Sequence, residues 1–300
     1  MLSILIPEFN WDCYLLVHKL WSQAIHLKIN FEIIVADDLS NNYDILLKNR
    51  KINDLKYCSF IELEQSLGRA SIRNWLADKS KYSTLLFLDC DARVESDNFI
   101  KIYLQNASLA SVVCGGVIHP NELPSKGMEL RYKYEKKADK KRTAYYRNKK
   151  KYSNFTTFSF LIDRKIFMSI KFDEKIKHYG YEDVIFGATL QEREVSIIHI
   201  DNPLIHLGIE SNALFLEKTR ESLISLLGSH DKIRDKSTLL LKYTSLKRAG
   251  FRPIILLFWR VFKKPINSNL NSSRPLLLLF SIYKLCYLSQ IDKIKSTTKK

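Results

Sequence analysis

The first ninety residues alternate between apolar runs of strand length and segments with a helical apolar stripe, and this alternation constrains the fold more than any other feature. The predicted strands are residues 2–6, 31–36, 59–63 and 84–88, and the helical segments are residues 12–28 and 68–78. Strands that are apolar on both faces and alternate with helices are typical of a mostly parallel sheet covered on both sides. The sequence therefore predicts the α/β fold class.

Strand character returns in the second half of the chain and then stops. Strands are predicted at residues 158–162, 197–200 and 204–206, and helices at residues 213–227 and 236–247. A chain of 300 residues has room for one large domain, or for a smaller domain with an extension. We therefore predict an α/β domain over residues 1–211 and a helical C-terminal extension over residues 212–300.

Two very apolar pieces of this extension, residues 254–262 and 276–288, are flanked by Lys and Arg. Neither reaches the roughly eighteen apolar residues that a spanning helix needs, but both are long enough to lie in a membrane interface. The alternative is a helical subdomain that packs on the α/β domain. The sequence leaves both interpretations open.

The cysteines and the N-terminus indicate the compartment. The five cysteines are scattered without a C-x-x-C pair, which argues against a disulfide framework and a structural zinc site. The start, MLSILIPEFN, has neither the basic region nor the long apolar run of a signal peptide. We expect a cytoplasmic protein, peripheral at the cytoplasmic face of the membrane if the extension binds lipid.

The formal net charge of +16 is concentrated in the middle of the chain. Residues 131–151 carry eleven Lys or Arg against two acids and are predicted to form an exposed basic helix or loop. Such a surface suits polyanions, which include anionic lipid headgroups, phosphorylated substrates and nucleic acid. The simpler interpretation is a solvated, Lys-rich surface.

Polar residues follow three of the predicted strands at the point where each strand ends. They are residues 7–10 (PEFN), Asp37 with Asp38, and Asp89 with Asp91. In parallel sheets, ligands bind beyond the carboxyl ends of the strands. Asp and Asn are also common in turns. Three polar ends at one edge nevertheless favour a ligand site.

Glycine-based phosphate loops are missing from the sequence, which contains neither G-x-G-x-x-G nor G-x-x-x-x-G-K-[ST]. This argues against a dinucleotide oxidoreductase and a P-loop NTPase. A bound diphosphate would then need a divalent cation to neutralise it. Asp89 and Asp91 supply the carboxylate oxygens that Mg²⁺ and Mn²⁺ prefer.

Two further elements have chemistry of their own. Glu182 and Asp183 begin a helical segment, where they act either as acids that favour the helix N-terminus or as a general base for a hydroxyl. His206 lies between apolar neighbours, as structural histidines do. Near the acidic metal site it would instead be a further ligand.

Taken together, five motifs in residues 1–210 resemble the family 2 glycosyltransferases, which are inverting enzymes with the GT-A type fold. The motifs are residues 3–10 (SILIPEFN), 32–40 (EIIVADDLS), 68–74 (GRASIRN), 87–91 (FLDCD), and 172–174 (FDE) followed by 180–183 (GYED). Two positions depart from the family pattern. Leu39 stands where the family usually has Gly, and Ala92 stands where many members have another Asp.

The resemblance implies roles for individual residues. Asp38 would hydrogen-bond the nucleotide base, and Pro7, Glu8, Phe9 and Asn10 would line its pocket. Gly68 and Arg73 would lie near the nucleotide, and Asp89 near the ribose. Asp91 and His206 would bind Mn²⁺ or Mg²⁺. Asp183 would be the catalytic base, with Glu182 beside it.

The resemblance further implies a hexosyl transfer from a nucleotide-diphosphate sugar, UDP-linked in our expectation, in cell-surface polysaccharide synthesis. The acceptor would be a hydroxyl of a glycan or lipid-linked glycan. An anionic membrane surface is an expected partner, and nucleic acid is not. Two other functions compete. A nucleotidyltransferase would carry a Gly-rich basic loop after the first strand, and a nucleic-acid-binding protein would show a binding motif beside the basic run.

Overall fold

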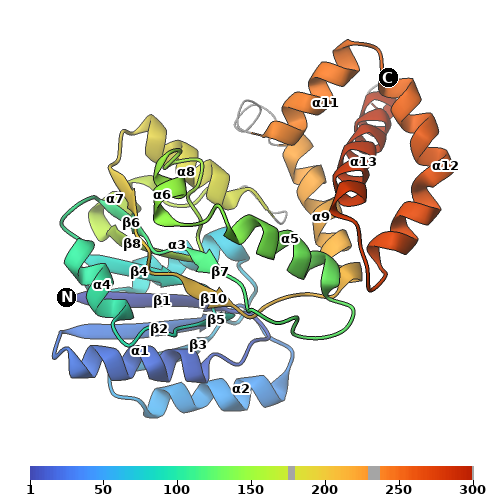
Figure 1. Ribbon diagram of the computed structural model, residues 1–300. Helices are drawn as coiled ribbons and strands as arrows, with labels where there is room; N and C mark the ends of the chain where they lie inside the picture. The colour runs from blue at the N-terminus through green and yellow to red at the C-terminus, as the bar shows by residue number, and fades with distance from the viewer. Residues whose placement is uncertain (175–179, 229–236, 299–300) are drawn as a thin grey trace. The chain divides into compact units, whose positions relative to one another are not determined.

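The computed structural model describes residues 1–174, 180–228 and 237–298, and its core is one twisted sheet (Figure 1). Seven described strands form this sheet in the order β3-β2-β1-β4-β8-β6-β9. All neighbouring strands are parallel except β8, which is antiparallel to β4 and β6. The strands are β1 (Leu2–Glu8), β2 (Phe31–Asp37), β3 (Cys58–Glu62), β4 (Thr84–Leu88), β6 (Val112–Cys114), β8 (Ser159–Asp163) and β9 (Ile197–His199).

The predicted α/β fold with a mostly parallel sheet is confirmed. Residues 4–6 of β1 are all apolar because both faces of the strand are covered, so successive side chains pack on opposite sides of the sheet. Ile4 and Ile6 pack in one hydrophobic cluster, whereas Leu5 packs in the other. The run extends further than predicted: Pro7 does not stop the strand but pairs with Ala36 near its end.

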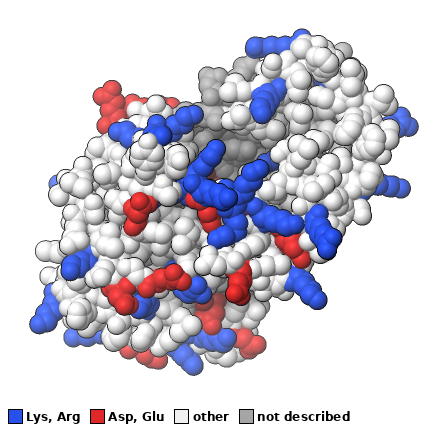
Figure 2. All heavy atoms as spheres, in the orientation of Figure 1, with Lys and Arg blue, Asp and Glu red and all other residues white. Residues whose placement is uncertain are grey.

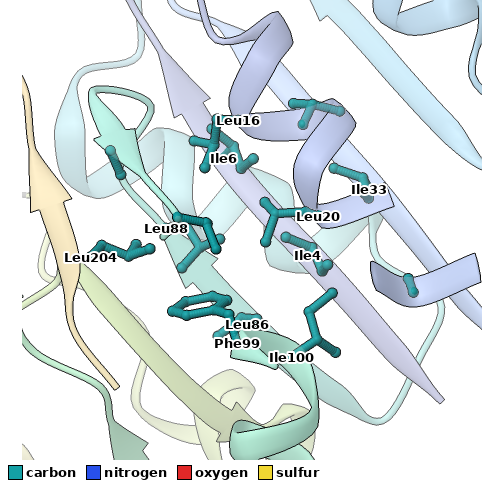
Figure 3. Close-up of a cluster of buried hydrophobic side chains, with 14 of the residues drawn as sticks. Ile4, Ile6, Leu16, Leu20, Ile33, Leu86, Leu88, Phe99, Ile100 and Leu204 are labelled. Carbon is teal, nitrogen blue, oxygen red and sulfur yellow. The ribbon is translucent and has the colours of Figure 1, made fainter. Parts of the chain in front are cut away.

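Helices cover both faces of the sheet. Figure 3 shows the first cluster, in which side chains of α1 (Tyr14–His26) and α4 (Phe99–Asn106) meet those of the central strands. The second cluster is formed with α3 (Arg69–Lys79), α7 (Arg164–Ile170) and α8 (Glu182–Glu192). Burial of one Leu or Ile side chain contributes about 1.5–3 kcal/mol, so these two layers stabilise the edge of the sheet that carries the polar residues.

The remaining described elements of the α/β part are connections. Two of them, α2 (Tyr43–Arg50) and the 3-10 helix η1 (Lys51–Asp54), lead from β2 to β3, and α6 (Ala144–Asn148) lies in the basic run. A small second sheet has the order β5-β10-β7, from β5 (Ala92–Arg93), β10 (Leu204–His206) and β7 (Val117–Ile118). It joins the segment after β4 to the one predicted at residues 204–206.

A second compact unit contains Asn121–Ala138 and Ile209–Lys300. Its described helices are α5 (Glu129–Asp139), α9 (Asn212–Gly228), α11 (Thr238–Arg248), α12 (Arg252–Leu270) and α13 (Leu277–Thr298). Of these helices, α5, α9, α12 and α13 bury a cluster that includes Phe215, Trp259, Leu270, Phe280 and Tyr283. The boundary between residues 211 and 212 stays a prediction. Residues 229–236, which include the start of the helix predicted at 236–247, and residues 299–300 lie outside the described part.

The two apolar pieces of the extension differ in their packing. Residues 276–288 lie largely within α13, whose Phe280, Tyr283 and Leu288 are buried. Residues 254–262 lie in α12, which buries Trp259 but exposes most of its other apolar side chains. Among the described residues, no helix combines the length and the apolar character needed to cross a bilayer.

Candidate functional site at the carboxyl edge of the sheet

Hydrogen bonds tie the loops after β1 and β2 together. The Asn10 amide donates to Ser40 Oγ at 2.6 Å, and Asn10 Oδ1 accepts from the amides of Asn41 and Asn42 at 3.1 Å. Asn10 (φ 51°) and Leu39 (φ 66°) are both left-handed. The φ of Leu39 gives a physical reason for the Gly usual in the family, since this conformation costs a residue with a Cβ about 1–2 kcal/mol.

The residues predicted to line the base pocket are not equally accessible. Phe9 is 57% exposed at the rim, whereas Glu8 is 1% exposed and points into the protein beside Asp37. Burial, with a further contribution from Asp37, raises the pKa of Glu8 to about 8. Glu8 therefore holds a proton at neutral pH, and its Oε1 accepts a hydrogen bond from the Trp11 amide at 2.6 Å.

The predicted donor-binding residues of β2, α3 and β4 are connected through the start of α3. Asp38 accepts hydrogen bonds from the amides of Leu67 (2.6 Å) and Gly68 (3.0 Å), so it shapes this loop whether or not it also meets a base. Gly68 has a φ of 79° at the N-cap of α3. One turn later, the buried Arg73 forms an ion pair with Asp89.

The small sheet brings His206 to Asp91. His206 pairs with Ala92 in the register of β10 and β5, and its Nε2 lies 3.0 Å from Asp91 Oδ2. The Leu207 amide donates to the Asp91 carbonyl at 2.8 Å. Burial alone would raise the pKa of Asp91, but the hydrogen bond with His206 and the charge of Arg69 hold it below the usual value.

The surroundings of this pair fit a divalent cation. A Cβ at Gly208 would lie 2.1 Å from Asp91 Oδ2 and 3.1 Å from His206 Nε2, so the cradle is lined by backbone that leaves the two donor atoms uncovered. Within residues 1–174, 180–228 and 237–298, no group of three or more His, Cys, Asp or Glu has the arrangement of a metal site. A carboxylate and an imidazole fit an ion that takes its other ligands from substrate phosphates and water.

Glu182 and Asp183 open α8. Asp183 is half-buried, and its Oδ1 accepts a hydrogen bond from the Val184 amide at 2.7 Å. Burial raises the pKa of Asp183 to about 6, and the charge of Glu182 adds to this, while Arg73 opposes it. A carboxyl with this pKa is ionised near neutral pH and is a better proton acceptor than an ordinary Asp.

Arg69 connects the two acidic elements. Its Nη1 lies 3.6 Å from Glu182 Oε1. Burial raises the pKa of Asp89, and the charge of Arg69 opposes this rise; the same charge helps to hold the pKa of Asp91 below its usual value. Asp91 of the predicted metal pair and Glu182, the neighbour of the predicted base, thus both interact with one cation on the first turn of α3. No role was predicted for Arg69, although it stands inside the GRASIRN motif.

Two further residues that contribute to the site, Asn74 and His119, were not predicted. Asn74 holds residues 172–174 in place, because it bonds the backbone N–H and C=O of Phe172 and, through Nδ2, the Glu174 carboxylate at 2.7 Å. His119 lies 3.3 Å from His206, and no motif marks it. The expectation of a uniformly exposed basic run was wrong at Arg147, which is buried and donates to the carbonyls of Cys114, Gly115 and Ile200.

Comparison with a sequence model of one family shows the family, and comparison with solved structures shows the fold. The sequence model described as "Glycosyl transferase family 2" matches residues 3–171, more than half of the chain. No curated protein matches the chain by sequence. Similar solved structures include the mannosyltransferase PcManGT from Pyrobaculum calidifontis in complex with GDP-Man and Mn²⁺. That similarity has a TM-score of 0.51 at 12% identity, and it covers 76% of this chain and 63% of that protein.

Two other similar structures have a TM-score of 0.50. TarS 1-349 from S. aureus in complex with UDP-GlcNAc is 15% identical, and 99% of this chain and 92% of that one are covered. GalNAc-T7 with UDP, GalNAc and Mn²⁺ is 16% identical, and the covered shares are 69% and 43%. At these identities the likeness concerns the fold, which is of the GT-A type. The matched family model, the fold and the five motifs lead to one conclusion: the chain belongs to glycosyl transferase family 2.

Proposed function

We propose that the protein is an inverting, divalent-metal-dependent glycosyltransferase that uses a nucleotide-diphosphate sugar. The observation that carries this proposal is the position of Arg69. It pairs with Glu182 beside the candidate base and acts electrostatically on Asp91 beside the candidate metal ligand His206. A candidate metal site and a candidate catalytic base near the same cation fit a reaction in which a diphosphate leaves and a hydroxyl attacks.

The side chains divide this reaction between them. Phe9, Asn10 and Asp38 border the region proposed for the nucleotide base. Arg69 and Arg73 add positive charge beside Asp89. Asp91 and His206 would hold Mn²⁺ or Mg²⁺, which stabilises the negative charge that develops on the departing diphosphate.

Asp183 takes the acceptor's proton. As the acceptor oxygen forms its bond to the anomeric carbon, the bond from that carbon to the phosphate oxygen breaks, and Asp183 receives the hydroxyl proton. Attack opposite to the leaving group inverts the anomeric configuration. We propose a UDP-linked hexose as donor and a hydroxyl of a glycan or lipid-linked glycan as acceptor, in cell-surface polysaccharide synthesis.

The identity of the released product tests the reaction class. We expect the purified chain, given a panel of UDP- and GDP-sugars with Mn²⁺, to release a nucleoside diphosphate, and chelation to stop the release. Chromatography of the nucleotides is the measurement. Pyrophosphate release from a nucleoside triphosphate and a sugar phosphate, with no nucleoside diphosphate from any donor, would instead identify a nucleotidyltransferase.

We also propose that α12 places the enzyme on an anionic membrane surface at its cytoplasmic face. Exposed apolar residues recur on α12 at helical spacing and form what we term the α12 stripe: Ile254, Leu257, Phe258, Val261 and Phe262. Arg260, Lys263 and Lys264 are exposed beside the stripe. On the face shown in Figure 2, the surface over α12 is largely uncharged, with Lys and Arg at its border.

This composition fits a helix whose apolar side enters the headgroup region while nearby cations meet anionic lipid, each contributing about 1 kcal/mol. Trp259, which lies within the apolar piece 254–262, is buried and donates to Gln290 Oε1 at 2.6 Å. The proposal therefore rests on the α12 stripe, in which Leu257 is 64% exposed, and not on Trp259.

Two acidic substitutions test the α12 stripe in the full chain. We expect Leu257→Glu with Val261→Glu to weaken binding to phosphatidylglycerol vesicles on the order of 10-fold or more, because carboxylates on the apolar side of the helix oppose its insertion and are repelled by anionic lipid. Co-sedimentation is the measurement. The matched control is Leu241→Glu, an exposed leucine of α11. A wild-type chain that ignores these vesicles contradicts the proposal, as does a dimer that the double variant dissociates.

A further inference from the structure

Four side chains form a hydrogen-bonded row that begins at the candidate metal site. His206 Nε2 lies 3.0 Å from Asp91 Oδ2, and the other ring nitrogen, Nδ1, lies 3.3 Å from His119 Nε2. His119 Nδ1 lies 2.9 Å from Asp139 Oδ1. The register of the small sheet sets up this row, because Ile118 of β7 pairs with Ile205 of β10 and the two histidines follow them.

The far end of the row is held in place. His119 is 4% exposed, and its backbone amide donates to Asp139 Oδ2 at 3.1 Å. Arg142 Nη1 donates to Asp139 Oδ1 at 3.2 Å. Although burial opposes it, the hydrogen bonds with His119 keep the pKa of Asp139 below its usual value. Asp139 is therefore a carboxylate.

Edge-to-face contacts fix the planes of the rings. The imidazoles of His119 and His206 meet at 81°, and Phe158 packs against His206 at 78°. With the rings held in these orientations, the assignment of protons to the ring nitrogens decides in which direction hydrogen bonds are donated along the row.

We propose that Asp139 and His119 are positioning residues that fix the tautomer and orientation of His206 for metal binding. This inference rests on the proposed function of the site. A carboxylate only accepts hydrogen bonds, so the proton of His119 lies on Nδ1 and its Nε2 accepts. His206 then donates from Nδ1 to His119. Its Nε2 donates to the Asp91 carboxylate in the hydrogen bond described above, and a cation bound between the two groups would take the place of that proton. Partners of this kind contribute roughly 10–100-fold to metal affinity.

Mn²⁺ binding, rather than turnover, tests the row. In the full chain with UDP and without acceptor, the electron paramagnetic resonance signal of free Mn²⁺ reports the bound fraction. We expect His119→Phe, which keeps a ring but removes the acceptor, to weaken Mn²⁺ binding roughly 10–100-fold. Asp139→Asn should weaken it in the same direction, because an amide can donate to His119 and reverse the row. His119→Gln, which retains an acceptor, should bind Mn²⁺ within a few-fold of the wild type.

The controls separate this inference from the proposed function. His18→Phe changes an exposed histidine of α1 and should leave binding unchanged, and thermal unfolding checks that each variant folds. If the wild type binds no Mn²⁺ with UDP present, the proposed function fails. If the wild type binds Mn²⁺ and folded His119→Phe binds it equally well, only the positioning role is overturned. Normal binding by Asp139→Asn would also overturn the row, since the proton direction would then not matter.

Discussion

Replacing Asp91 with Asn should nearly abolish sugar transfer while the fold survives. An amide oxygen is a poor ligand for a hard divalent cation, and His206 would be left as the other protein ligand of the site. The loss should appear as weaker binding of both Mn²⁺ and donor, because each supplies ligands or charge for the other. Turnover with a UDP-sugar, together with calorimetric titration of Mn²⁺, measures the effect.

A matched substitution separates metal binding from a general change of charge. Asp97 is an exposed aspartate in an ion pair with Lys19, and Asp97→Asn removes the same charge from the same chain. We expect this control to keep wild-type turnover. If the wild-type enzyme turns over unchanged with excess chelator present, the assignment of a metal to Asp91 is wrong.

Replacing Asp183 with Asn should lower turnover about 10²-fold or more and leave donor binding roughly intact, the usual scale for the loss of a general base. A factor of 10² corresponds to about 2.7 kcal/mol in the activation free energy. Single-turnover kinetics, with donor affinity measured separately, distinguishes the two effects. The carboxylate of Asp183 acts in the chemical step in this account, whereas the metal pair acts on the donor.

The pH profile gives an independent check, because burial raises the pKa of Asp183 to about 6. The base accepts a proton only when ionised, so turnover should be at its plateau well above pH 6 and fall about tenfold per unit below it. This limb should be absent in Asp183→Asn.

A true capping acid provides the control for Asp183. Asp163 caps α7 by accepting hydrogen bonds from the amides of Lys165 and Ile166. Asp163→Asn should leave turnover close to the wild type. Wild-type turnover in Asp183→Asn as well would mean that Asp183 serves only the N-terminus of α8.

The large strands could be predicted because their physical signal is local. Residues 33–36 and 85–88 are apolar without alternation, as expected of strands covered on both faces. The strands β5 and β7 have two residues each, too few for any pattern to show. The family resemblance assigned Asp91 and His206 to one site. The strand register that brings them together belongs to the small sheet, in which β5 and β7 are too short to be predicted.

Other features depend on tertiary packing and could not be predicted from any local sequence pattern. Nothing local distinguishes Trp259, which packs inward, from Phe258, which is partly exposed beside it. The sequence likewise could not assign a partner to His119, because its contact with His206 joins residues far apart in the chain. Arg147 looked like one more member of a basic run until its buried hydrogen bonds to three carbonyls were seen.

The antiparallel placement of β8 has a consequence for how such a chain can diversify. Cys114 of β6 pairs with Phe160 of β8, so residues 115–158 leave the sheet and return to it at a single edge, the one that Asp91 follows. A segment attached in this way can be lengthened or exchanged without shifting the strand register of the large sheet. Exchange is nevertheless not neutral for chemistry. The same segment carries His119 and Asp139, so a graft that alters it also replaces the support behind His206.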